Sequence, residues 1–148
     1  MAKKVIVFDI DGTVANIEHR QHFVKTKPKN WPAFNRGIPN DLLHVDIAWL
    51  FNVLADREET VMLFASGRGE EDRAKTEDWL RKHGFVFEKL YMRPAKDSRP
   101  DNIVKGEILE QIRAEFGEPF MVFDDRNSVV DMWRANGVRC LQVAPGAF

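Results

Sequence analysis

Polar side chains that could do chemistry follow three apolar segments of the chain. In chain order these groups are Asp9 and Asp11, then Ser66, Gly67 and Arg68, and finally Asp124 and Asp125. If the segments are parallel strands, their carboxyl ends meet at one edge of a sheet, where α/β proteins bind ligands. Acidic residues also end strands simply because loops are polar, but that explanation covers one strand more easily than three. We therefore expect the groups to form one site.

A cluster of carboxylates at one sheet edge needs a counter-charge. Two carboxylates about 4 Å apart repel by about 4 kcal/mol at an effective dielectric constant near 20. A bound cation, a shared proton or both must offset this repulsion. Oxygen ligands favour Mg²⁺, which usually keeps water and substrate phosphate among its ligands. The four histidines show no metal-ligand spacing. The predicted substrate is therefore a phosphate ester, with Mg²⁺ as the cofactor.

The segments that carry these groups alternate with helical patterns. Continuous apolar runs, typical of strands buried on both faces of a parallel sheet, occupy residues 5–8, 60–65, 87–92, 120–123 and 138–143. Helical patterns follow a cap at Asn40 and Asp41, precede Gly84, extend from a cap at Asp101 to Phe116, and end before Gly137. The alternation predicts an α/β doubly wound fold, a Rossmann-like three-layer α/β/α sandwich around a central parallel sheet.

Residues 14–39 interrupt this alternation, because they contain no clear strand. A connection of this length is usually a lid or a binding loop. We therefore expect a small cap insert after the first strand, over about residues 14–58. The chain of 148 residues has the length of one domain, so residues 1–148 are predicted to form a single domain.

Composition argues against several classes of protein. The net charge of −1 excludes a globally basic nucleic-acid binder, and the single cysteine, Cys140, excludes an internal disulfide and is expected in the core. No apolar run approaches the roughly 20 residues that span a membrane, and the run after Lys4 is too short for a secretory signal. We expect a cytoplasmic protein without membrane contact. A kinase is disfavoured because no G-x-x-x-x-G-K-[ST] motif is present.

Four motifs, in order, resemble those of the haloacid dehalogenase (HAD) superfamily. They are Asp9-Ile10-Asp11-Gly12-Thr13, Ser66, Lys105 and Asp124-Asp125. The resemblance implies a sheet of order 5-4-1-2-3 with the Asp9 strand at its centre. It also implies Mg²⁺-dependent hydrolysis of a phosphomonoester through an aspartyl-phosphate. Asp9 is the implied nucleophile, and Asp11 is the implied general acid and base, expected to be protonated because its surroundings are acidic.

The same resemblance suggests roles for further residues. The implied ligands of Mg²⁺ are Asp9, the main-chain carbonyl of Asp11, Asp124 and Asp125. The groups expected to bind the phosphate are Ser66, the Gly67 amide and Lys105. The residues expected to bind the rest of the substrate are Arg20, Arg68, Thr13 and Arg126. Two of them have a simpler alternative, since Thr13 could bond within the first loop and Arg126 could merely begin a helix.

A closer resemblance concerns the substrate. Residues 66–68, 101–107, 124–133 and 143–148 are similar to the 3′-phosphatase domain of the bacteriophage polynucleotide kinase-phosphatase family. Arg20 falls where that family has a substrate-binding arginine. The resemblance implies a polynucleotide 3′-phosphatase that acts on phosphorylated DNA or RNA ends, with a separate polynucleotide kinase or ligase as a partner.

A basic segment lies inside the predicted insert. Residues 19–40 contain five basic and no acidic residues, with Trp31 and Phe34 among them, and a second basic cluster is formed by Arg93, Lys96 and Arg99. Basic and aromatic side chains together suit single-stranded nucleic acid, although the aromatic rings could equally fasten a solvated loop to the domain. Two other functions stay open, a phosphatase for nucleotides or sugar phosphates and a non-catalytic nucleic-acid-binding module.

Overall fold

The apolar runs form a five-stranded parallel sheet. In the computed structural model, which describes residues 2–148, the strands of this sheet are β1 (Lys4–Phe8), β4 (Thr60–Gly69), β5 (Lys89–Arg93), β6 (Pro119–Asp124) and β7 (Cys140–Gln142). Their order is β5-β4-β1-β6-β7, and each neighbouring pair is parallel. With the two strands of the insert left out of the count, this is the predicted order read from the opposite edge. The fold class is confirmed.

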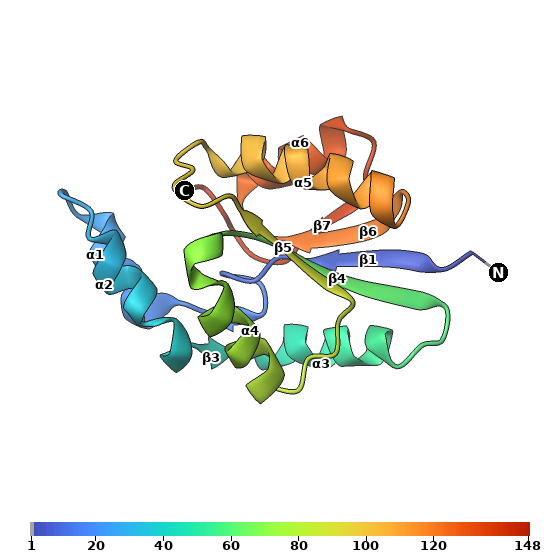
Figure 1. Ribbon diagram of the computed structural model, residues 1–148, viewed down its shortest axis with the longest axis horizontal. Coiled ribbons are helices and arrows are strands. Elements are labelled where there is room, and N and C mark those ends of the chain that lie inside the picture. Colours follow the sequence, from blue (N-terminus) through green and yellow to red (C-terminus); the bar gives the residue numbers. More distant parts are fainter. Residues whose placement is uncertain (1) are drawn as a thin grey trace.

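Helices cover both faces of the sheet (Figure 1). In β1, Val5 and Val7 pack toward one layer, whereas Ile6 and Phe8 pack toward the other. The first layer consists of α5 (Asp101–Glu115) and α6 (Asn127–Ala135), and the second consists of α3 (Val45–Ala55) and α4 (Arg73–Lys82). Because both faces are buried, successive residues of the strand are all apolar, which is why the runs are continuous.

The connection from β1 to α3 stands apart from these layers. It contains β2 (Ala15–Asn16), α1 (Glu18–Lys25), α2 (Trp31–Arg36), the 3₁₀ helix η1 (Ile38–Asn40) and β3 (Leu42–Leu43). We call residues 15–43 the cap segment. Its two strands pair antiparallel, and α1 and α2 extend beyond the carboxyl ends of the sheet strands (Figure 1). The expectation that residues 14–39 lack a strand was wrong, because a two-residue strand is too short to show an apolar period.

Two predicted helix caps were also wrong. α3 begins at Val45 after His44, not after Asn40 and Asp41, and the side chain of Asp41 binds arginine residues instead. α5 is preceded by Pro100, and Asp101 is its first helical residue, with a carboxylate that pairs with two arginines. An aspartate before a helix resembles a cap in sequence, but a cation from a distant element binds its carboxylate more strongly than a backbone amide does.

The connection from β4 to α4 is short. β4 continues through Ser66 to Gly69, where it pairs with Arg93 after an irregularity in the ladder, and the 3₁₀ helix η2 (Glu70–Asp72) leads into α4. Across residues 2–148, the helices are too short or too polar to cross a bilayer.

Candidate active site

A tight turn after β1 presents the first two aspartates. The carbonyl of Ile10 accepts hydrogen bonds from the backbone amides of Thr13, Val14 and Ala15, at 3.0–3.1 Å. Gly12 has a φ of +82°, and a Cβ at this position would overlap the carboxylate of Asp125. Only glycine fits there without strain. The turn therefore brings the β1 end against the β6 end.

Asp9 is buried, and both of its carboxylate oxygens hold a hydrogen bond. Lys105 Nζ donates to Oδ1 at 2.7 Å, and Thr13 Oγ1 donates to Oδ2 at 3.0 Å. Thr13 itself is fully buried. In this structure the Thr13 hydroxyl orients Asp9 within the first loop, the simpler of the two roles expected for it, and its binding of substrate stays a prediction. Two donors on two oxygens fix the plane of the Asp9 carboxylate.

Lys105 joins the ends of two strands. From the buried face of α5, its ammonium donates to Asp9 and, at 2.8 Å, to Asp124 Oδ2. Burial opposes the charge of Lys105, but Asp124 and Asp9 outweigh it and hold the pKa of this ammonium above its ordinary value. The backbone amide of Asp125 and the indole Nε1 of Trp133 also donate to the Asp124 carboxylate. Asp124 is therefore held from three sides.

Three carboxylates form a candidate metal site. Asp9, Asp124 and Asp125 each offer one oxygen, and these oxygens lie within 4.8 Å of one another. Burial and the negative charge of Asp124 raise the pKa of Asp9 well above its ordinary value, and burial raises the pKa of Asp125 to about 6. With one Lys105 against three carboxylates, two formal negative charges are left, the charge of one divalent cation. The all-oxygen donor set fits a hard ion such as Mg²⁺.

The side chain of Asp11 is directed to arginines and is not part of that cluster. Its Oδ1 accepts hydrogen bonds from Arg20 Nη2 at 3.0 Å and from Arg68 Nε and Nη2 at 3.1 and 2.6 Å. Within residues 2–148, no group donates to its Oδ2. Burial alone raises the pKa of Asp11, but Arg68 and Arg20 outweigh it, and the pKa is lowered. The expectation that acidic surroundings protonate Asp11 was wrong, because its nearest charges are positive.

Asp41 holds this pair of arginines in place. Its carboxylate accepts two hydrogen bonds from Arg20, both at 2.8 Å, and one from Arg68 at 3.1 Å. His19 Nε2 lies 2.6 Å from Asp41 Oδ1, and the Trp79 indole donates to the Asp41 carbonyl at 2.9 Å. Arg20 and Arg68 are both buried, so in this structure they orient Asp11. Sequence reasoning missed Asp41, because an aspartate after Pro-Asn resembles a helix cap.

The remaining predicted residues are Ser66 and Gly67 of β4 and Arg126, which follows β6. Ser66 is buried, and its Oγ accepts a hydrogen bond from the Arg68 amide at 3.0 Å. A Cβ on Gly67 would lie 2.7 Å from an oxygen of Asp101, so the start of α5 packs closely against this part of β4. Asp101 bridges Arg93 and Arg126, and Arg126 Nη1 donates to it at 2.9 Å. Within the second basic cluster, Arg93 therefore pairs with Asp101 of the site.

These groups surround a cleft of about 940 Å³. Asp9, Asp11, Lys105, Asp124 and Asp125 all line it, together with Gly67, Arg68 and Arg126. Side chains of the cap segment line it as well, including Lys25 of α1, Lys29 of the connection between the helices and Trp31 of α2. The structure thus brings together residues from β1, β4, α5 and β6, as the position of the polar groups after the apolar runs predicted. The assignment of individual roles to them stays a prediction.

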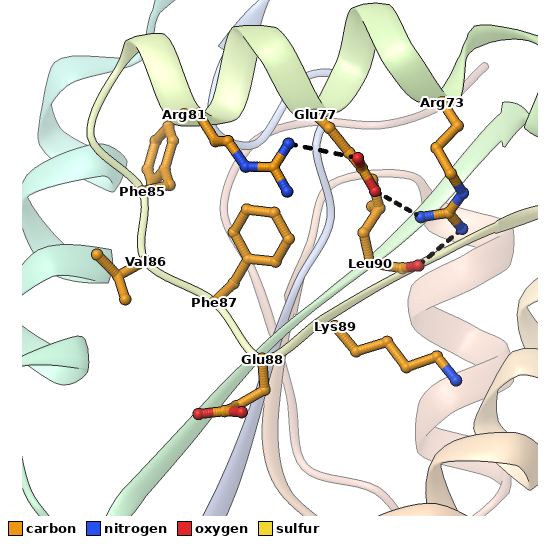
Figure 2. A pocket seen from close by; sticks show the side chains of 9 residues that line it. All are labelled: Arg73, Glu77, Arg81, Phe85, Val86, Phe87, Glu88, Lys89 and Leu90. Carbon is orange, nitrogen blue, oxygen red and sulfur yellow. Dashed lines mark hydrogen bonds and ion pairs between the residues drawn. The ribbon is translucent and has the colours of Figure 1, made fainter.

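A second hollow, of about 510 Å³, lies between α4 and the segment that leads into β5 (Figure 2). Phe85 and Phe87 contribute its apolar part. Figure 2 shows that Glu77 accepts from both Arg73 and Arg81, and that Arg73 also donates to the Leu90 carbonyl. The side chains of Arg73, Glu77 and Arg81 are therefore engaged with one another. The chemistry belongs to the larger cleft.

Comparison with known proteins agrees with this geometry. The family model described as "Polynucleotide kinase PNKP phosphatase domain" matches residues 3–148. The chain is 29% identical over 133 residues to a putative bifunctional polynucleotide kinase/RNA ligase of Autographa californica nuclear polyhedrosis virus, covering 88% of this chain and 18% of that protein. This chain therefore spans only a small part of that relative.

Solved structures show the same fold. A chain in the structure of the Pnkp1/Rnl/Hen1 RNA repair complex superposes with a TM-score of 0.82 at 30% identity, covering 99% of this chain and 44% of that one. The haloacid dehalogenase-like hydrolase SP0104 from Streptococcus pneumoniae superposes with a TM-score of 0.65 at 14% identity, over 95% of this chain and 84% of that one. The second match supports the fold alone.

Proposed function

Since the chain belongs to the family of the polynucleotide kinase PNKP phosphatase domain, a group of HAD-like phosphatases, we propose that it removes the 3′-phosphate from polynucleotide ends. The observation that carries the proposal is the placement of Asp9. Its carboxylate is oriented by Lys105 and Thr13, lines an open cleft, and lies beside the carboxylates of Asp124 and Asp125. This is the arrangement that an in-line attack on phosphorus needs.

In the first step Asp9 attacks the phosphorus. A bond forms between a carboxylate oxygen of Asp9 and phosphorus, the ester P–O bond breaks, and its electron pair goes to the leaving oxygen. Lys105 favours the ionised nucleophile, since its charge opposes the effects of burial and of Asp124 on the pKa of Asp9. Water then hydrolyses the aspartyl-phosphate and regenerates Asp9.

Asp11 serves as the general acid and then as the general base. With three arginine nitrogens on Oδ1, its Oδ2 is the oxygen left to protonate the leaving group. The arginines lower the pKa of Asp11 in the free protein, so this carboxyl group is ionised before substrate binds. A phosphoryl dianion beside Asp11 raises that pKa again, because a like charge favours the neutral carboxyl group. Substrate binding thereby prepares Asp11 to donate.

The other predicted residues supply charge and hydrogen bonds to the phosphate. Ser66, the Gly67 amide and Lys105 bind the non-bridging oxygens, and Arg126 binds the adjoining part of the substrate. Arg68 acts through Asp11, whose carboxylate it orients. Asp9, Asp124, Asp125 and the main-chain carbonyl of Asp11 would hold Mg²⁺. When bound, this ion offsets the carboxylate charge and polarises the phosphoryl group.

A polynucleotide end fits the surroundings of the site better than a small substrate. The cap segment is basic and forms one wall of the cleft. The viral relative is described as a putative polynucleotide kinase/RNA ligase, and the matched structure is of an RNA repair complex. We therefore propose that the chain acts on phosphorylated DNA or RNA ends beside a kinase or ligase, whether as a separate protein or as another domain of a longer chain.

The experiment that tests this function compares three kinds of substrate. Phosphate release is measured from a 3′-phosphorylated oligonucleotide, from 3′- and 5′-mononucleotides and from an aryl phosphate, each with Mg²⁺ and with a chelator. We expect kcat/KM to be highest for the oligonucleotide and release to stop with the chelator. Preference for a mononucleotide would indicate a small-molecule phosphatase. No release from any substrate would indicate a non-catalytic binding module.

The Asp9→Asn variant identifies the nucleophile. An amide cannot form the acyl-phosphate, so we expect turnover to fall at least about 10⁴-fold, the scale of losing a covalent catalyst. The shape of Asn matches Asp, and Lys105 keeps its ion pair with Asp124 in the variant, so we expect the protein to fold. Circular dichroism and thermal unfolding check that the variant folds. An active and folded Asp9→Asn protein refutes the assignment.

A further inference from the structure

The cap segment presents one large exposed aromatic ring to the active-site cleft. Trp31 is 50% exposed and lines the same cleft as Asp9. Phe34, which the sequence groups with it, is only 8% exposed and packs against the Arg20 guanidinium at 4.2 Å. Each of the two explanations for these aromatic residues therefore applies to one of them. Phe34 fastens the segment to the domain, and Trp31 is available to a ligand.

The Trp31 ring is held from one side. It packs edge to face on Phe34, with ring centroids 5.5 Å apart and an interplanar angle of 88°. Asn30 caps α2 by accepting a hydrogen bond from the Ala33 amide at 3.1 Å, and Pro32 follows Trp31 in the first turn. A ring fixed in advance loses little conformational entropy when a ligand stacks on it.

Cations without an ion-pair partner among residues 2–148 line the same cleft as this ring, and one of them lies close to it. Lys29 Nζ lies 5.7 Å from the centroid of Trp31. Lys25, Lys29 and Arg36 line the cleft, and none of them makes an ion pair with any residue from 2 to 148. By contrast, most of the other charged side chains in the cleft are paired, as Arg126 is with Asp101. A rigid exposed ring beside unpaired cations is the combination that binds single-stranded nucleic acid.

The position of the ring relative to the catalytic groups is also defined. Arg20 Nη1 donates to the Phe34 carbonyl at 3.4 Å, and Arg20 Nη2 donates to Asp11 Oδ1 at 3.0 Å. Trp31 therefore connects through Phe34 and Arg20 to the group that protonates the leaving oxygen. This chain of contacts gives the ring a defined position relative to Asp11.

We propose that Trp31 is a stacking platform for one base near the 3′ end of the polynucleotide, and that Lys25 and Lys29 bind its backbone phosphates. This inference rests on the proposed function and adds a specificity-determining residue to it. Stacking needs an unpaired base, so the platform selects single-stranded 3′ ends over blunt duplexes. The contacts of Lys25 and Lys29 with backbone phosphates favour an oligonucleotide over a mononucleotide, which lacks those phosphates. Stacking one base on an aromatic side chain corresponds to about 5- to 150-fold in affinity.

The test is a double-mutant cycle between Trp31 and the bases of the ligand. Binding of a 3′-phosphorylated oligonucleotide is measured by titration calorimetry in the Asp9→Asn background, with Trp31→Ala, Trp31→Phe and Trp49→Ala. Trp49 is the matched control, because it is 67% exposed on α3 and does not line the cleft. Each protein is also titrated with oligonucleotides that are abasic at the terminal or at the penultimate position.

We expect Trp31→Ala to weaken binding at least 5-fold, Trp31→Phe to restore most of the loss, and Trp49→Ala to change binding less than 2-fold. One abasic oligonucleotide should lose affinity with Trp31 intact and lose little more with Trp31→Ala, because both changes remove the same stack. Equal binding by Trp31→Ala and Trp49→Ala overturns the proposal. The proposal is also overturned if, at both abasic positions, the loss from Trp31→Ala and the loss from the abasic site multiply, because the two changes then act independently.

The proposed function is tested separately in the same material. Phosphate release by the protein with Asp9 intact reports on the function, whereas binding by the Asp9→Asn series reports on the platform. If the oligonucleotide is hydrolysed, but the affinity losses from Trp31→Ala and from the abasic site are independent at both positions, only the platform is overturned. If the oligonucleotide binds through Trp31 but is not hydrolysed, only the function is overturned.

Discussion

The two aspartates of the first motif have opposite environments although they lie two residues apart. Asp9 faces Asp124 and is buried, so its pKa is raised, whereas Asp11 faces Arg20 and Arg68, so its pKa is lowered. Asp125 shares the environment of Asp9, and burial raises its pKa to about 6. The carboxylates of this cluster therefore repel one another, and a bound cation would relieve that repulsion.

The Asp125→Asn variant makes this repulsion measurable. Between about pH 4 and pH 6 the folded protein keeps a proton on Asp125 that the unfolded chain, with an ordinary pKa near 4, has released. Stability therefore falls as the pH rises through that range. We expect Asp125→Asn to be more stable than the parent protein at pH 7 in chelator, on the order of 1 kcal/mol, and little different below pH 4. Urea unfolding at several pH values measures both.

Addition of Mg²⁺ supplies the control for that experiment. A ligand that binds only the folded state stabilises it by an amount that grows with the logarithm of ligand concentration over Kd, so a tighter site is stabilised more. At pH 7 we expect Mg²⁺ to raise the melting temperature of the parent protein more than that of Asp125→Asn, which lacks one ligand. An equal rise in both proteins contradicts the placement of Asp125 at the metal site.

At the scale of elements, the turn from β6 to α6 depends on the last residues described. The Asn127 amide donates to the Gly146 carbonyl at 2.9 Å, and Arg126 Nε donates to the Phe148 carbonyl at 2.9 Å. The Arg126 guanidinium also lies 5.3 Å from the centroid of the Phe148 ring. These contacts press residues 143–148 against the turn that presents Asp124 and Asp125.

Substitution of Gly146 by Ala tests that dependence. A Cβ at this position would overlap the Asp125 carbonyl, and because this is backbone, one of the two segments must move. We expect a loss of about 1–3 kcal/mol in unfolding free energy, the usual cost of overpacking, together with weaker Mg²⁺ binding. Urea unfolding and metal titration measure these effects.

Gly106→Ala is the matched control for Gly146→Ala. It lies inside α5, and its nearest new contact is Met132 Sδ at 3.9 Å. We expect it to gain about 0.5–1 kcal/mol, because alanine favours a helix interior. If Gly146→Ala binds Mg²⁺ as tightly as Gly106→Ala, the final segment does not position the metal ligands.

For the whole molecule, the distribution of charge matters more than its sum. The net charge is −1, yet residues 19–40 carry five positive charges and no negative ones, which leaves −6 for the remainder. Figure 1 shows α1 and α2 beyond the carboxyl ends of the strands, so this positive charge lies at the edge where Asp9 is found. A polyanion is attracted to that edge and repelled by the remaining surface.

The salt dependence of binding measures this attraction. For a single strand, the slope of log affinity against log salt concentration is about −0.7 for each phosphate contact. We expect the double substitution of Lys25 and Lys29 by Glu to make the slope shallower by at least about 1.4, since at least two contacts are lost. Lys82→Glu, an exposed charge on α4 outside the cleft, should leave the slope unchanged. Identical slopes in all three proteins contradict phosphate binding by the cap segment.

The sequence alone determined the sheet and the kind of group at its edge. Continuous apolar runs and the polar residues after them are local features, and parallel strands necessarily carry those residues to one edge. The tertiary structure alone decided which partner each polar group has. Thr13 binds Asp9, and Asp41 binds Arg20 and Arg68.

The pKa of Asp11 shows why this division exists. Its direction depends on Arg68, which lies 57 residues away in the chain, and on Arg20, which a further distant residue, Asp41, holds in place. Electrostatic interactions depend on distance in space, and spacing along the chain does not reveal which charges meet. The residue types could therefore be predicted from the sequence, whereas their protonation and orientation required the folded arrangement.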